Sequence, residues 1–472
     1  MELLFESRLE VLRATGRLRF VVGEPEVLPE PVLRPDCPAD GTGANIYGSV
    51  LRDGGLLRMW YQAWPADWNG RTVDYVGYAE SDDGLAWRKP ALGLVPDGPP
   101  GNNLSDLALH SPSVSIDPSA PPEARYRATG YSGPGRPGAR ADLQEPGYYT
   151  AHSADGLHWV FDAPGPRWRG GDVITSVYHP ARGRVEVALK HNPRAGGMPR
   201  RSIWQATLCG QEATAPLAAL VPDAYDDVCA AARGYHTGDY YGMGMMPAGR
   251  GLVGFLWNFR HALPLTPGRE YGVFGTVDVS LVYQPGPGEA WLHVHGRPDF
   301  FAHGRPSWTA GGIYTAANTL DMGEEQWLYL GGAQYSHAWQ LDERWQPDAA
   351  RLAAMRGAGR MAIGVARWRR DRLFGFTADP AGELELDLGV VARPSTLVLN
   401  YVTSARGSLR VELPGRPGYS LEESRLLAGD ALAGEASWQG GTLLPAAADA
   451  PLTARVHLEE ATLYAYEVRP LA

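Results

Sequence analysis

One turn motif occurs twice in the chain and sets a length scale for everything around it. SDDGLAW at residues 81–87 returns 72 positions later as SADGLHW at residues 153–159. Each copy follows an alternating apolar and polar run, DYVGYAE and PGYYTAH, which predicts a strand that ends in a tight turn. A degenerate third copy, PGPGEAW at 285–291, comes 132 residues after the second, close to twice the first interval. The spacing therefore indicates a repeated unit, one copy of which has lost the motif.

A second pattern gives the same period. Predicted pairs of adjacent strands begin near Asn45, His110, Asp172, Asp239 and Gly312, so that successive starts are 65, 62, 67 and 73 residues apart. Five units of about 65 residues, each with roughly four strands, are typical of a β-propeller. We therefore predict an all-β protein whose residues 36–345 form a five-bladed propeller, in which the first strand of each unit lines the central axis.

The pattern changes after residue 345. Residues 345–360, WQPDAARLAAMRGAGR, predict a short helical or irregular linker. The stretch RMAIGVARWRRDRLFGF that follows begins a series of strands with Gly and Pro turns but without the 65-residue unit. We expect residues 346–472 to form this linker and a C-terminal β-sandwich. Residues 1–35 are expected to supply N-terminal strands that pack on the sandwich or close the propeller.

Composition excludes several classes of protein. The net charge of −10, with two lysines in 472 residues (Lys89 and Lys190), predicts no nucleic-acid partner. The N-terminus lacks a secretory signal pattern and no apolar run reaches about 18 residues, so we expect no membrane partner. Cys37, Cys209 and Cys229 are odd in number and without CxxC pairing, which favours a reduced, cytoplasmic setting over a disulfide framework or a zinc site. No cofactor or metal is predicted.

The residues that suggest a family run through most of the chain. They are LRPDCPAD (33–40), LRMWYQ (57–62), YAESDDGLAWRKPALGL (78–94), GNNL (101–104), HSPSVSIDP (110–118), GDVITSVYHP (171–180), VDVSLVY (277–283), GRMAIGVARWRRDRLFGF (359–376) and SLRVELPG (408–415). The chain resembles the five-bladed propeller superfamily of glycoside hydrolase families 32, 68, 43 and 62, and most of all family-32-like bacterial proteins with a C-terminal β-sandwich. The resemblance implies a glycoside hydrolase or transglycosylase that acts on a small carbohydrate, for example a fructofuranoside or an arabinofuranoside.

Glycosidic cleavage needs one carboxylate as nucleophile or base and one protonated carboxyl as acid. In the families that the chain resembles, these groups come from the inner strands of the first three blades. The corresponding acids here are Asp40, just ahead of the first inner strand, and Asp172, at the start of the third. Asp239 stands at the start of the fourth inner strand and is the third catalytic candidate. For Asp40 a solvated turn beside Gly41 and Gly43 is the alternative.

Two positions depart from the family pattern. Asn45 and Ser111 stand where the resemblance would place acids, and we expect them to bind substrate instead. The other predicted substrate-binding residues are His110, Asp278, Trp308, Tyr314 and His337. Each has a structural alternative, namely a hydrogen-bonded channel histidine, a buried ion pair or aromatic packing between blades.

The departures at Asn45 and Ser111 leave a second class of function open. A propeller that kept the fold and lost the carboxylates would be a non-catalytic carbohydrate-binding protein. A sialidase-like enzyme is a further alternative, and it would require an arginine cluster at the centre of the propeller. The separation of the carboxyl pairs distinguishes the catalytic from the non-catalytic case. If no two carboxyl groups lie within about 10 Å of each other, glycosidic cleavage loses its physical basis, because retaining enzymes hold the two groups about 5 Å apart and inverting enzymes hold them somewhat farther apart.

Overall fold

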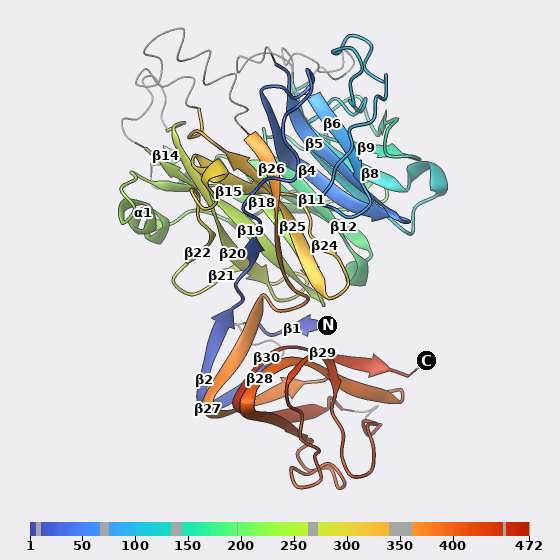
Figure 1. The fold of residues 1–472 in the computed structure, drawn as a ribbon, viewed down its shortest axis with the longest axis vertical. Coiled ribbons are helices and arrows are strands. Elements are labelled where there is room, and N and C mark those ends of the chain that lie inside the picture. Colours follow the sequence, from blue (N-terminus) through green and yellow to red (C-terminus); the bar gives the residue numbers. More distant parts are fainter. Residues whose placement is uncertain are drawn as a thin grey trace.

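The structure is a computed structural model that describes residues 1–5, 11–66, 75–133, 143, 145–195, 197–262, 272–338, 361–446 and 450–471. Strands dominate these residues, in a larger upper part and a smaller lower part (Figure 1). The prediction of an almost entirely β protein is confirmed. The linker predicted at 345–360 lies outside the described residues.

Five small sheets follow one another along the described chain, and each begins with a predicted strand pair. The first contains β4 (Gly43–Asp53), β5 (Leu56–Trp64) and β6 (Tyr75–Ser81). The second contains β7 (His110–Ile116), β8 (Tyr126–Ser132), β9 (Gly147–Ser153) and β10 (Val160–Phe161). The third contains β11 (Ile174–His179), β12 (Arg184–His191), β15 (Ser202–Cys209), β16 (Glu212–Ala213) and β17 (Leu217–Leu220), and the hairpin β13 (Arg194–Ala195) and β14 (Met198–Pro199) lies beside it in the sequence.

The last two of these sheets follow the same plan. The fourth contains β18 (Gly238–Ala248), β19 (Gly251–His261), β20 (Gly275–Gln284), β21 (Leu292–His293) and β22 (Asp299–Phe301). The fifth contains β23 (Gly312–Thr315), β24 (Leu320–Asp321), β25 (Glu325–Ala333), β26 (Met361–Arg369) and β3 (Glu26–Val27). Short 3-10 helices occur at Pro122–Ala124, Pro180–Arg182 and Ser307–Thr309. Every residue of β20 is buried, as expected for a strand that is covered on both faces.

Hydrogen bonds join each of these sheets to the next, and the fifth to the first. Ser49 Oγ accepts from the Val114 amide (2.9 Å), Ser111 Oγ donates to the Ile174 carbonyl (3.1 Å), and Thr175 Oγ1 donates to the Met243 carbonyl. The Met245 amide donates to the Ala317 carbonyl (2.9 Å), and the Ala317 amide donates to the Gly48 carbonyl (2.8 Å). The five sheets therefore contact one another in chain order, and the last one returns to the first.

The repeated turn makes the same contact twice. Asp83 Oδ1 accepts from the Leu85 amide (2.8 Å), and Asp155 Oδ1 accepts from the Leu157 amide (2.8 Å). The carbonyl of each turn glycine accepts a hydrogen bond from a side chain of the preceding sheet. Tyr329 Oη in the fifth sheet donates to the Gly84 carbonyl (2.8 Å), and Trp60 Nε1 in the first sheet donates to the Gly156 carbonyl (2.7 Å). Both glycines have a left-handed φ, +81° and +77°, which L side chains rarely adopt. The motif is thus a structural turn that docks one sheet on its neighbour.

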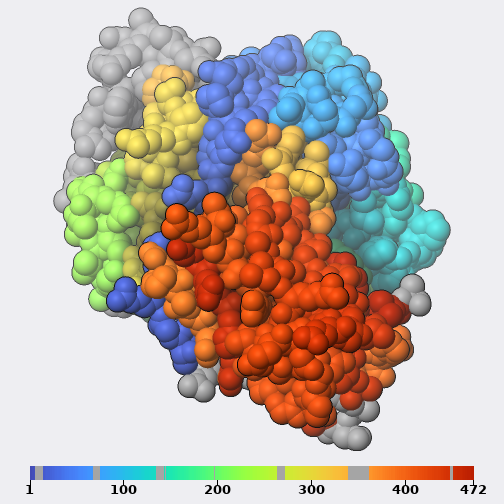
Figure 2. Space-filling model, turned by 60° about the horizontal axis from the view of Figure 1, so that its bottom comes forward, coloured from blue at the N-terminus to red at the C-terminus, as the bar shows by residue number. Residues whose placement is uncertain are grey.

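The lower part is one further sheet that both ends of the chain build. Its path is β2 (Val11–Val22), β27 (Phe374–Asp387), β30 (Thr453–Pro470), β28 (Ser395–Glu412) and β29 (Asp430–Glu435), with β1 (Glu2–Leu3) paired to β30. The C-terminal residues form a contiguous orange and red body in Figure 2. Arg372 links it to the fifth sheet, because it lies just after β26 and its Nε donates to Asn400 Oδ1 (2.8 Å).

One local prediction needs correction, and one element was not predicted. β26, which we expected in the sandwich, pairs along its whole length with β25, and its other edge pairs with β3 from the N-terminal segment. The repeat spacing missed β26 because residues 334–360 separate it from β25. The short helix α1 (Ala224–Ala231) was not predicted; Asp223 and Asp226 form a reciprocal capping box at its start. No helix among the described residues has the length and apolar character needed to cross a bilayer.

Candidate functional site

Side chains from the first strands of the sheets, or from just before them, form a group that we call the central cluster: Tyr47, His110, Asp172, Tyr241 and Tyr314, with Lys190 and His337 beside them. The rings of Tyr47 and Tyr314 lie 5.2 Å apart and nearly perpendicular, and that of Tyr47 lies 5.9 Å from His110. The Tyr241 ring lies 6.1 Å from that of Tyr314. The structure therefore brings together the predicted residues His110, Asp172, Tyr314 and His337.

Irregular strand pairing helps to aim these side chains. The register shifts between Asn45 and Ser49 in β4, between His110 and Ser113 in β7, and between Tyr240 and Gly242 in β18. Shifts of this kind bend a strand and redirect its side chains, and they are frequent beside binding sites. In all three sheets the irregularity lies next to a member of the central cluster.

Asp172 is the accessible acid of this cluster. Its side chain is 39% exposed and forms an ion pair with Lys190, whose own side chain is 5% exposed. Burial is the main cause that raises the pKa of Tyr47 and of Tyr241 well above the usual value, and the charge of Asp172 adds to it. Both phenols therefore stay neutral at any physiological pH.

Asp239 lies in the same region but is buried and fully paired. Its side chain is 2% exposed, and it accepts from Arg200 Nε (2.8 Å), Arg201 Nη1 (3.1 Å) and His261 Nε2 (2.9 Å). Burial alone would raise the pKa of Asp239, but the bonds from His261 and the two guanidinium groups outweigh it and lower that pKa to about 2. A carboxylate held in this way is charged and closed to solvent.

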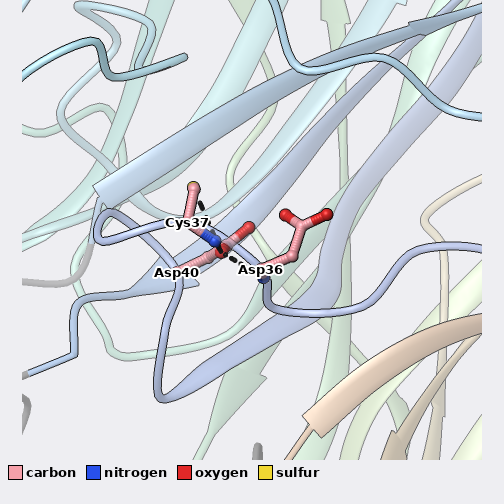
Figure 3. Close-up of side chains that lie close together, drawn as sticks. All are labelled: Asp36, Cys37 and Asp40. Carbon is pink, nitrogen blue, oxygen red and sulfur yellow. Dashed lines mark hydrogen bonds between the residues drawn. The ribbon is translucent and has the colours of Figure 1, made fainter.

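Asp40 forms a separate group with Asp36 and Cys37 (Figure 3). It is fully buried, and its oxygens accept from the Cys37 amide (3.1 Å), Tyr61 Oη (2.8 Å) and Lys89 Nζ (2.5 Å). Burial, followed by the nearby Asp40 charge, raises the pKa of the Cys37 thiol. The three residues offer atoms within 4.8 Å of one another that could hold a cation, but Lys89 already contacts both carboxylates.

The remaining predicted residues lie in packed surroundings. Asn45 is fully buried, and its side chain has no hydrogen-bond partner among the described residues. It faces Gly331 of β25, where a Cβ would lie 1.9 Å from Asn45 Oδ1. Ser111 is also buried, and its amide donates to Gln62 Oε1 (2.8 Å). Asp278 pairs with Arg260 and accepts from the His303 amide (2.7 Å). The ring of Trp308 packs against the fifth sheet at Gly332 and Gly364, where the lack of side chains leaves room for it. Trp308 Nε1 donates to the Pro29 carbonyl.

Four residues in or beside the central cluster were not predicted from the sequence: Tyr47, Tyr241, Lys190 and Arg201. Tyr47 and Tyr241 occupy the same place in their units as Tyr314, in the triplets NIY, DYY and GIY, so aligning the five strand starts would have revealed them. Lys190 carried a different signal, since it is one of only two lysines in the chain. Arg201 gave none, because it lies in an ordinary arginine-containing stretch before β15.

No family model and no curated protein matches the sequence. Among solved structures, the chain is similar to a β-1,2-mannobiose phosphorylase from Listeria innocua in complex with β-1,2-mannobiose (8% identity, TM-score 0.45, 73% of this chain and 96% of that one). It is also similar to a glycosyl hydrolase from Bacteroides ovatus (14% identity, TM-score 0.44, 75% and 95%) and to BT0996 in complex with RGII (11% identity, TM-score 0.44, 73% and 92%). Membership of families 32, 68, 43 or 62 stays a prediction.

Proposed function

We propose that the five sheets are the blades of a five-bladed β-propeller and that the lower sheet belongs to a C-terminal β-sandwich. The circuit of hydrogen bonds from sheet to sheet supports this arrangement, and so does the pairing of N-terminal β3 with β26, which ties the start of the chain into the last sheet. We also move the predicted domain boundary. The propeller would span residues 26–369, and the second domain would contain residues 374–470 with β1 and β2.

We further propose that the chain cleaves a glycosidic bond at the central cluster, with Asp172 as the carboxyl group that exchanges a proton with the substrate. One observation carries this proposal. Of the three acids predicted to be catalytic, Asp172 has a side chain that is 39% exposed, whereas those of Asp40 and Asp239 are 0% and 2% exposed. A general acid or base must come within hydrogen-bond reach of the substrate, and the two buried acids have their oxygens occupied by other donors.

Asp40 and Asp239 take supporting roles in this proposal. Asp239 pairs with two buried guanidinium groups beside the cluster, one of which, that of Arg201, lies 5.8 Å from the centre of the Tyr241 ring. Asp40 holds the loop before β4 onto β5 and onto Lys89. Both would act by shaping the site rather than by contact with the sugar.

Hydrolysis is the first candidate reaction, with a small oligosaccharide as substrate. It requires a second carboxylate to activate water or to attack the sugar. Phosphorolysis is the second candidate, favoured by the two cationic side chains that lie over the Tyr241 ring, with Lys190 Nζ 4.3 Å and the Arg201 guanidinium 5.8 Å from its centre. In phosphorolysis the phosphate supplies the nucleophile, so a single carboxyl group suffices, and lysine and arginine are the side chains that bind phosphate.

The test is release of sugar from a panel of α- and β-linked disaccharides and aryl glycosides, with and without inorganic phosphate. Asp172→Asn should lower turnover by about 10²–10⁴-fold, the usual contribution of a general acid or base. The matched control is Asp82→Asn, at an exposed acid of the first repeated turn that pairs with Arg88. Full turnover by Asp172→Asn would refute the assignment. Sugar binding without any turnover by the wild type would favour the non-catalytic alternative, and dependence on phosphate would select phosphorolysis.

A further inference from the structure

The ammonium group that pairs with Asp172 rests on an aromatic ring. Lys190 Nζ lies 4.3 Å from the centre of the Tyr241 ring while it contacts Asp172 Oδ1. The backbone of Lys190 is held as well, since its amide donates to the Val173 carbonyl (3.1 Å) and its carbonyl accepts from Tyr148 Oη (2.7 Å). The four-carbon stem of a lysine is flexible, so a fixed backbone does not by itself fix the ammonium. The ring of Tyr241 is one surface that limits where this charge can lie.

His337 in turn holds Tyr241. Its backbone amide donates to the Gly275 carbonyl (2.8 Å), and its Nδ1 lies 2.6 Å from the Val273 carbonyl. A carbonyl can only accept, so Nδ1 carries the proton of the neutral ring and Nε2 is left as an acceptor. Nε2 lies 3.0 Å from Tyr241 Oη, which must therefore be the donor. Burial is the main reason that the pKa of His337 falls to about 4, so this neutral form persists at neutral pH.

We infer that His337 is a positioning residue of the Asp172 site: it accepts the hydroxyl proton of Tyr241 and so fixes the ring that places Lys190 against the Asp172 carboxylate. This inference deepens the proposed function and rests on it for its catalytic consequence. The order of contacts is the Val273 carbonyl, His337, Tyr241, Lys190 and Asp172. Phe259 and Tyr314 flank the same ring, at 5.7 and 6.1 Å, and limit its tilt, and the side chain of Tyr47 forms a hydrogen bond with that of Tyr241.

The two lysines of the chain allow a direct test. Selective labelling of lysine with ¹⁵N gives two side-chain signals, one from Lys190 and one from Lys89, which pairs with Asp40 outside the cluster. His337→Ala and Tyr241→Phe, which remove the two partners of the same hydrogen bond, should shift the Lys190 signal in the same direction and leave the Lys89 signal in place. His337→Gln restores an acceptor and should return the Lys190 signal toward its wild-type position. An unchanged Lys89 signal shows in each case that the variant has folded.

Activity gives the second measurement. On a substrate found in the panel, His337→Ala should lower kcat by roughly 10–100-fold with little change in KM, as expected when a catalytic group is displaced while substrate binding is kept. His337→Gln should recover most of this activity. The matched control is His158→Ala, at the 65% exposed histidine of the second repeated turn, which should change neither measurement.

Two results would overturn the inference. One is an unshifted Lys190 signal in both His337→Ala and Tyr241→Phe. The other is a shifted signal with wild-type kcat, which would make the contact structural only. If the wild type turns over no glycoside, the proposed function fails while the lysine spectra still decide whether His337 orders Lys190.

Discussion

Replacing Asp239 by Asn tests whether this buried carboxylate stabilises the fold. Its pKa is about 2 in the folded protein, against 3.8 for an ordinary aspartate, because the bonds from His261, Arg200 and Arg201 outweigh the effect of burial. A difference of about 1.8 between the two pKa values is worth about 2.4 kcal/mol of unfolding free energy. The substitution also leaves two buried guanidinium groups without this partner, and breaking a buried ion pair costs about 3–5 kcal/mol. We expect Asp239→Asn to lose about 2–5 kcal/mol at pH 7.

The pH dependence gives this prediction its sign. Because folding lowers the pKa of Asp239, the stabilisation is fully present above pH 3.8, declines as the pH falls, and is lost as the pH passes through about 2. Urea unfolding followed by tryptophan fluorescence at pH 7 and at pH 3 measures both quantities. The deficit of Asp239→Asn relative to the wild type should be smaller at pH 3, whereas the exposed-site control Asp82→Asn should stay within about 0.5 kcal/mol of the wild type. A variant as stable as this control at pH 7, or a deficit of equal size at both pH values, would refute the reasoning.

Two further predictions concern packing and a second buried pair. Gly156→Ala places a Cβ 2.7 Å from Trp60 at a φ of +77°, whereas Gly183→Ala, the control, has a φ of +60° and open space around it. In thermal unfolding, Gly156→Ala should therefore lose about 1–3 kcal/mol more unfolding free energy than Gly183→Ala. Equal losses in the two variants would exclude the docking role of the turn. Lys89→Met leaves the buried Asp40 carboxylate without its cation and should lower the unfolding free energy by about 3–5 kcal/mol. Adding Asp40→Asn removes that carboxylate charge and should recover part of the loss in the same measurement. A double variant less stable than Lys89→Met would contradict the pairing.

Local chemistry explains why much of the fold could be predicted from the sequence. The turns at 81–87 and 153–159 are closed by hydrogen bonds between residues two or three positions apart, such as that from the Gly84 amide to Ser81 Oγ (2.8 Å). A short sequence contains all the groups involved, so the motif marks the unit wherever it occurs. The five strand pairs were predicted for the same reason, because each joins antiparallel strands that are close together in the chain. β26 was misplaced because its partner β25 is separated from it by a long segment, beyond the reach of a local pattern.

The sequence by itself determined the repeated unit, the strand pairs, and the acids that stand near the starts of the first strands of the units. Only the tertiary structure decided which of those acids is accessible, because ionisation and access depend on partners that are distant in the chain. Asp40 pairs with Lys89, 49 residues away, and Asp239 pairs with Arg200, 39 residues away, and in both cases the carboxylate is buried with its cation. Asp172 also has a cation, Lys190, yet it lies on the exposed side of that pair. Packing left one of these three carboxylates open to solvent and placed Asp40 in a separate group with Asp36 and Cys37.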